Sequence, residues 1–267
     1  MRSHGRRGGN SEATDGTRDQ DARMDERGMP ISGDAWGQAL LATAEGCDPE
    51  VVLERDDGLV AVDHAQSYFA PLDNWNAADR WALDRARGRV LDLGAGAGRA
   101  ALELQARDQP VVALDTSPGA VEVCRRRGVR DVVFGTIDTL ALSEPVLFDS
   151  VVALGNNLGL LGNPRDAHAM LEALAAITTP DAIIVGTGLD PYATEDPLHF
   201  AYHRRNRDLG KWPGEITIRV RYQNVATEWF DLLWCSAEEL GHICVNTEWH
   251  IAETLDATPY GVVLARN

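Results

Sequence analysis

The sequence predicts an α/β protein with a doubly wound, mostly parallel sheet. Three observations support this prediction: short apolar runs alternate with helical segments after residue 88, the runs are only a few residues long, and a glycine-rich turn follows the first of them. Short apolar runs between helices are typical of strands that are buried on both faces. Right-handed crossovers then place helices on both sides of the sheet.

Each element of this alternation can be assigned from its residues. We expect strands over residues 90–93, 111–114, 132–134, 150–154 and 182–186, and helices over residues 100–107, 118–127 and 165–177. Pro118 suits the first turn of its helix, and Gly128 suits the position after its end.

The residues before position 88 do not show this alternation of strands and helices. Residues 1–30 are rich in Gly, Arg, Asp and Ser with few large apolar side chains, so we expect a disordered tail. Asp34 is a suitable cap for a helix that stops near Gly46. Two apolar runs around Asp57–Gly58 predict a hairpin. A further helix ends by Gly88, so residues 31–87 form an N-terminal helical cap segment.

The last third of the chain predicts antiparallel structure. The stretch "ITIRVRY" alternates strictly and, with "EWFDLLWC", predicts a hairpin. Ser236 and Glu239 have the spacing of a capping box, which opens a short helix. The stretches "VNTEWHIAETL" and "PYGVVLA" predict two closing strands.

Composition narrows the class of protein. The 267 residues carry a formal charge of −16, which argues against a nucleic-acid partner because phosphate binding needs a basic face. No run approaches the roughly 18 apolar residues of a membrane span. The four cysteines form no CxxC pair and no His/Cys ligand cluster, which predicts reduced thiols, no metal site and a cytoplasmic protein.

The glycine-rich turn indicates its ligand. Asp92 precedes three glycines in the order D-x-G-x-G-x-G, whereas a dinucleotide fingerprint needs a small residue where Arg99 stands. An acid before the loop would repel a pyrophosphate but suits a ligand with an ammonium group. The segment resembles motif I of the class I S-adenosylmethionine-dependent methyltransferases.

Three later segments extend this resemblance. Asp115 ends the second strand, where an acid holds a ribose diol or, alternatively, only caps the next helix. In "DVVFGTIDTL", Thr136 replaces the Asp or Asn with which many relatives reach the adenine, so Ile137 or Asp138 would substitute. The stretch "FDSVVALGNNLGLLG" resembles motif IV.

The resemblance implies a Rossmann-like seven-stranded sheet whose last strand is antiparallel, carried by a domain over residues 88–267. It also implies S-adenosyl-L-methionine as the cofactor, with S-adenosyl-L-homocysteine as its product. The expected cofactor-binding residues are Tyr68, Asp92, Gly94, Ala95, Gly96, Gly98, Asp115, Thr116, Thr136, Ile137, Leu154, Gly155 and Asn156.

Residues 190–235 form an insertion after the fifth strand that is rich in aromatic side chains, and we expect it to cover the acceptor. His199 and His203 are candidate bases because they would share one face of a helix, and Tyr202 could hydrogen-bond the acceptor. Structural histidines and simple packing of the hairpin are the alternatives. The expected acceptor-binding residues are Asn157, Phe200, Arg219 and Trp229.

These observations predict a methyltransferase that acts by in-line transfer, for which positioning supplies much of the acceleration. Residues 199–240 resemble a bacterial branch of the family found in secondary metabolism, which implies a small aromatic or nitrogen-heterocyclic acceptor. The cluster at Arg204, Arg205 and Arg207 leaves a peptide or amino-acid acceptor open. A nicotinamide-dependent oxidoreductase and a non-catalytic S-adenosylmethionine-binding module are further alternatives.

Overall fold

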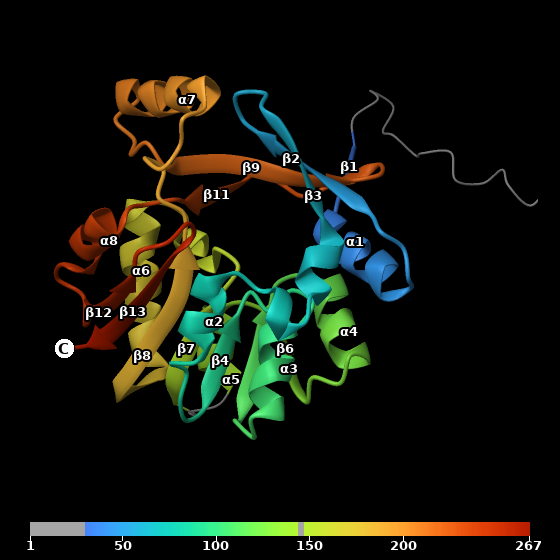
Figure 1. Cartoon of the computed structure of the whole chain (residues 1–267), viewed down its shortest axis with the longest axis vertical. Helices are drawn as coiled ribbons and strands as arrows, with labels where there is room; N and C mark the ends of the chain where they lie inside the picture. The colour runs from blue at the N-terminus through green and yellow to red at the C-terminus, as the bar shows by residue number, and fades with distance from the viewer. Residues whose placement is uncertain (1–29, 144–146) are drawn as a thin grey trace, which may run out of the picture.

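The computed structural model describes residues 30–143 and 147–267, so nearly all of the predicted tail lies outside the described residues. The described chain forms a seven-stranded main sheet and a six-stranded covering sheet. Figure 1 shows the covering sheet above one end of the main sheet, with helices around both.

The main sheet confirms the predicted fold class. Its order is β12-β13-β8-β7-β4-β5-β6, and β13 runs antiparallel to both of its neighbours while β4 to β8 are parallel. The strands are β4 (Val90–Leu93), β5 (Val111–Asp115), β6 (Asp131–Phe134), β7 (Phe148–Ala153), β8 (Thr178–Gly188), β12 (Trp249–Leu255) and β13 (Tyr260–Arg266).

Helices cover both faces of the main sheet, as a doubly wound fold requires. One face packs against α2 (Ala77–Leu83), α3 (Arg99–Ala106) and α4 (Pro118–Arg126). The other packs against α5 (Ile137–Ser143), α6 (Pro164–Ala176) and α8 (Ala237–Cys244). Ser236 forms the predicted capping box with Glu239. The short helix α5 was not among the elements predicted from the sequence.

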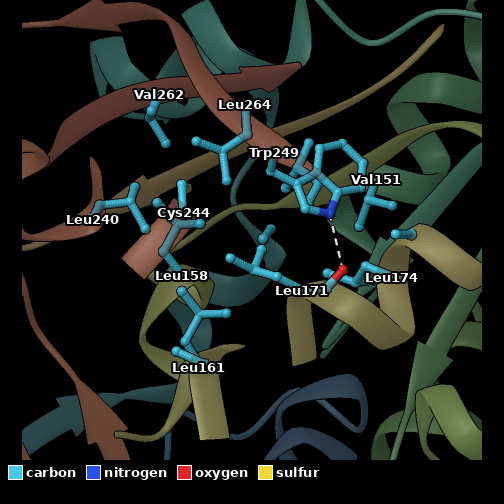
Figure 2. Close-up of a cluster of buried hydrophobic side chains, with 14 of the residues drawn as sticks. Val151, Leu158, Leu161, Leu171, Leu174, Leu240, Cys244, Trp249, Val262 and Leu264 are labelled. Atoms are coloured by element: carbon cyan, nitrogen blue, oxygen red, sulfur yellow. Dashed lines mark hydrogen bonds between the residues drawn. The ribbon is translucent and has the colours of Figure 1, made fainter. Parts of the chain in front are cut away.

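The largest apolar cluster lies on the α6 and α8 side of the main sheet (Figure 2). Trp249 of β12 is 1 % exposed, and its indole nitrogen donates to the carbonyl oxygen of Leu171 at 2.9 Å. The bond satisfies the one polar atom of the side chain, so the whole ring can be buried.

The covering sheet joins segments that are far apart in the sequence. The two predicted hairpins form as β2 (Glu50–Arg55) with β3 (Val60–His64), and as β9 (Glu215–Tyr222) with β11 (Phe230–Leu233). Strand β2 then pairs antiparallel with β9, so the two hairpins make one sheet. Short strands β1 (Ile31–Ser32) and β10 (Val225–Ala226) extend it.

Helix α1 (Ala35–Ala44) lies between the covering sheet and α4. Gly37 and Gly119 allow a close approach of α1 and α4, because a Cβ on Gly119 would lie 2.5 Å from the Gly37 backbone. Asp34 caps α1 through the Gly37 amide, and its second oxygen accepts from Ser117 Oγ and the Gly119 amide. One carboxylate therefore fastens the N-terminal segment to the start of α4.

Helix α7 (Pro197–Asp208) lies beyond β9, away from the main sheet (Figure 1). The four cysteines, all within the described residues, are free, and only Cys47 is exposed. Among the described residues, no helix has the length and apolar character needed to cross a membrane.

Candidate cofactor site

The glycine loop, residues 94–98, turns directly from β4 into α3. Gly94, Gly96 and Gly98 all have positive φ angles, which favour glycine. A Cβ on Gly94 would lie 2.7 Å from Asn157 Nδ2, and one on Gly98 would lie 2.8 Å from Val129 Cγ2. A Cβ on Gly96 would meet only the Tyr68 ring, at 3.8 Å. Gly96 is therefore the glycine of this loop that leaves room for a ligand.

Asp115 lies beside that open position. Its Oδ2 accepts from the Gly96 amide and its Oδ1 accepts from the Ser117 amide, both at 2.8 Å. Burial raises the pKa of Asp115, and these backbone hydrogen bonds act against the shift. A carboxylate oxygen can accept more than one hydrogen bond, so Asp115 keeps acceptor capacity for a diol. Its neighbour Thr116 is exposed.

Asp92 has a different environment from the one its motif position implied. It is 3 % exposed, and its Oδ2 accepts from the Ala101 amide of α3 at 3.1 Å. Burial raises the pKa of Asp92 to about 7. The structure thus joins Asp92 to the first turn of α3, and its contact with a cofactor stays a prediction. Ala95 is also buried, at 8 % exposure.

Tyr68 brings the N-terminal segment over the glycine loop. It belongs to the 3₁₀ helix at Ala65–Phe69, and its hydroxyl donates to Asp63 Oδ2 at 3.2 Å. Its ring makes an edge-on contact with Trp36 of α1, with 4.7 Å between centroids. These two contacts orient the ring above Gly96.

The post-β7 loop, residues 154–157, contacts the glycine loop at Gly94. Asn157 donates through Nδ2 to the carbonyl oxygens of Leu93 and Gly94, at 3.0 and 2.8 Å, and so ties the two loops together. Leu154 is buried, whereas Asn156 has a φ of 68° and its amide donates to Thr187 Oγ1. Among the described residues, Asn156 Oδ1 is buried without a hydrogen-bond partner. Such an oxygen fits a ligand that can donate a hydrogen bond.

The segment after β6 offers fewer contacts. Thr136 is exposed and its side chain and backbone bond to Thr139 at the start of α5, while Ile137 is buried in the core. Phe134, which sequence reasoning missed, is 58 % exposed and is the register partner of Asp115. An exposed phenylalanine beside Asp115 offers an apolar surface to a flat ring.

The predicted catalytic residues lie on α7. The hydroxyl of Tyr202 donates to Asp56 Oδ1 at 2.7 Å and accepts from the Thr217 amide at 3.3 Å, which fastens α7 to the covering sheet. His199 Nδ1 lies 2.9 Å from Thr194 Oγ1. Burial lowers the pKa of His203. Within the described chain, no hydrogen bond or ring contact joins these three residues to the glycine loop, so their catalytic role stays a prediction.

The predicted acceptor-binding residues are brought together only in part. The Arg219 guanidinium lies 4.8 Å from the Trp229 ring centroid, and its Nε donates to Glu54 Oε2 at 2.6 Å. Phe200 is half-exposed on α7. Asn157 instead belongs to the post-β7 loop.

Comparisons with known proteins find a methyltransferase domain in the chain and the same fold in solved methyltransferases. Residues 90–181 match the family model described as "Methyltransferase domain". The structure resembles a SAM-dependent methyltransferase from Bacteroides fragilis in complex with S-adenosyl-L-homocysteine, with a TM-score of 0.74 and 23% identity, covering 90% of this chain and 96% of that one. It also resembles the CcbJ methyltransferase from Streptomyces caelestis, with a TM-score of 0.53 and 17% identity over 76% and 95% of the two chains.

A curated relative agrees with this class. Demethylmenaquinone methyltransferase of Clavibacter sepedonicus is 29% identical over 165 residues, which are 54% of this chain and 67% of the relative. Residues 90–181 therefore match a methyltransferase domain, the described chain has the fold of S-adenosylmethionine-dependent methyltransferases, and together the matches support an enzyme of that type. S-adenosylmethionine is the cofactor of the family. The match to a methyltransferase domain argues against the alternative of a nicotinamide-dependent oxidoreductase.

Proposed function

We propose that this enzyme methylates a small acceptor with an aromatic or nitrogen-heterocyclic ring, using S-adenosylmethionine held over Gly96 and beside Asp115. The observation that carries the cofactor part is the open space over Gly96 beside a carboxylate with spare acceptor capacity. In this proposal Asp115 holds the ribose hydroxyls, Tyr68 covers the glycine loop, and Asn156 Oδ1 accepts a hydrogen bond from the ligand.

S-adenosylmethionine supplies an electrophilic methyl group on a sulfonium. The chain has to orient the acceptor, exclude water and, where the acceptor is protonated, remove a proton. Tyr68 and the post-β7 loop serve to exclude water, because they lie on either side of the glycine loop.

Exposed aromatic side chains support the acceptor part. Among the described residues, the exposed Phe, Tyr and Trp side chains are Phe134, Tyr192, Phe200, Trp229 and Phe230. Four of these five come from residues 190–235, the segment predicted to cover the acceptor. Exposed aromatic side chains can stack on a flat ring, and this supports an acceptor that carries one.

Calorimetry with S-adenosylhomocysteine tests the cofactor part. We expect Asp115→Ala to weaken binding by about 10- to 100-fold, because it removes hydrogen bonds to a charged group. Asp181→Ala is the matched control, since Asp181 is exposed on β8 outside the described site. A wild-type protein that does not bind, or an Asp115→Ala variant that binds equally well, would contradict the proposal.

Mass spectrometry with S-adenosylmethionine and a panel of acceptors tests the rest. Aromatic and nitrogen-heterocyclic compounds should gain the mass of one methylene group. Trp229→Ala should raise the KM for the acceptor and leave the Kd for S-adenosylhomocysteine unchanged, whereas Leu209→Ala, directly after α7, should change neither. Methylation of amino acids or peptides alone would favour the alternative acceptor class.

A further inference from the structure

A buried carboxylate that sequence reasoning missed lies behind the cofactor site. Asp79 of α2 is 0 % exposed and accepts four hydrogen bonds from other residues. Its Oδ1 accepts from the Gly155 amide and from Thr187 Oγ1, both at 2.9 Å. Its Oδ2 accepts from Arg99 at 2.6 Å and from Asn76 Nδ2 at 3.0 Å. A buried charge of this kind is costly unless it is fully hydrogen-bonded, as this one is.

Three of the four donors come from different segments around the cofactor site, and the fourth, Asn76, is the N-cap of α2 itself. Arg99 is the first residue of α3, directly after the glycine loop, and Gly155 belongs to the post-β7 loop. Thr187 of β8 in turn accepts from the Asn156 amide, next to the unpartnered Asn156 Oδ1. Asp79 therefore fixes, directly or through one residue, the backbone on both sides of the proposed ligand.

Arg99 is itself held in place. Its guanidinium lies 4.5 Å from the ring centroid of Trp75, just upstream of α2, and its Nη2 would lie 3.2 Å from a Cβ on Gly155. An ion pair between α2 and α3 thus fills the space behind the post-β7 loop. Tyr68, which covers Gly96, lies in the same N-terminal segment as Asp79.

We propose that Asp79 and Arg99 are a positioning pair that sets the separation of the glycine loop and the post-β7 loop. Through this pair, docking of the N-terminal segment determines the affinity for S-adenosylmethionine. The inference rests on the proposed function, because it assumes that the cofactor binds between these loops. A binding site holds its ligand precisely only when hydrogen bonds behind it, such as those to Asp79, keep its loops rigid.

A second ion pair in the same region serves as a control for the Asp79–Arg99 pair. Arg107 and Asp84, which directly follow α3 and α2, also form an ion pair at 2.8 Å, but with side chains that are 29% and 61% exposed. In contrast, the side chains of Arg99 and Asp79 are 17% and 1% exposed. Loss of the Arg107–Asp84 pair weakens the same helix contact without touching either loop.

The test compares Asp79→Asn, Arg99→Lys, the double variant and Asp84→Asn. We expect Asp79→Asn to raise the Kd for S-adenosylhomocysteine and the KM for S-adenosylmethionine by at least tenfold, with a smaller change in kcat. Arg99→Lys should raise both less, because it retains the charge but not the planar geometry. The double variant should lose less affinity than the product of the single losses. Asp84→Asn should stay within twofold of wild type.

Thermal unfolding of each variant separates positioning from general stability. If Asp79→Asn does not fold, Arg99→Lys decides, and wild-type affinity in a folded Arg99→Lys variant would overturn the proposal. Equal losses in Asp79→Asn and Asp84→Asn, or a folded Asp79→Asn variant with wild-type affinity, would also overturn it. A wild-type protein that does not bind S-adenosylhomocysteine would overturn the proposed function first, whatever the variants do.

Discussion

The main sheet and the covering sheet are stabilised in different ways. Helices bury both faces of the main sheet, and its central strands carry almost only apolar residues. The covering sheet buries one face against α1, where Val220 and Leu53 lie opposite each other. Its other face carries the register pair Glu54 and Arg219, together with Arg221.

This difference suggests that the two sheets serve different functions. The main sheet fixes the glycine loop, Asp115 and the post-β7 loop through a dense core that tolerates little change. The covering sheet presents charged and aromatic side chains that can change at small cost in stability. Cofactor binding should therefore depend on the main sheet, and acceptor choice on the covering sheet.

The largest expected effect comes from the core of the main sheet. Trp249→Ala should lower the free energy of unfolding by about 3–5 kcal/mol, because it leaves a cavity in the largest apolar cluster and removes the hydrogen bond to Leu171. Denaturant unfolding measures the change. Trp229→Ala, directly before β11 of the covering sheet, is the control, and it should cost about 1 kcal/mol or less because Trp229 is 44 % exposed. Similar losses in both variants would remove the distinction.

A smaller effect is expected in how the stability of the protein depends on pH. The pKa of Asp92 rises to about 7 on folding, so the folded state holds a proton that the unfolded state has already released. The stabilisation from this proton is present below about pH 4 and is lost as the pH rises towards 7. Even half of this pKa shift would change the free energy of unfolding by roughly 2 kcal/mol.

Asp92→Asn removes this titration. Relative to the variant, the wild-type protein should therefore lose stability between about pH 4 and pH 7, measured without ligand as the difference between the two unfolding free energies. If the two pH profiles run parallel, Asp92 does not titrate in this range.

The smallest effect concerns the polar face of the covering sheet. Glu54→Gln should lower the free energy of unfolding by no more than about 1 kcal/mol, because the pair with Arg219 is partly solvated. The loss should shrink further in high salt. A loss above about 2 kcal/mol, insensitive to salt, would show that this face is as tightly coupled as the main core.

Local sequence signals predicted the main sheet well. Pro118 and Gly128 mark the limits of α4, the apolar runs give β4 to β8, and the two closing strands form as expected. The end of α2 was predicted less well: the helix stops at Leu83 rather than near Gly88. Helix α5 was missed because its seven residues are too few to show a clear helical periodicity.

Long-range contacts could not be predicted in the same way. Nothing in residues 50–64 indicates that β2 pairs with β9, because both strands alternate like any half-buried strand. Asp79 looks like an ordinary helix residue near an Asn cap, and only the fold brings Gly155, Thr187 and Arg99 to it. Tyr202 was assigned to the acceptor, whereas its described hydrogen bonds join α7 to Asp56 and Thr217.

A crystal structure with S-adenosylhomocysteine tests the central claim most directly. The account predicts the ribose hydroxyls on Asp115, the ligand passing over Gly96 beneath Tyr68, and a ligand donor within hydrogen-bond distance of Asn156 Oδ1. A nucleoside bound elsewhere, or a ligand that leaves Asp115 and Gly96 without contact, would contradict it.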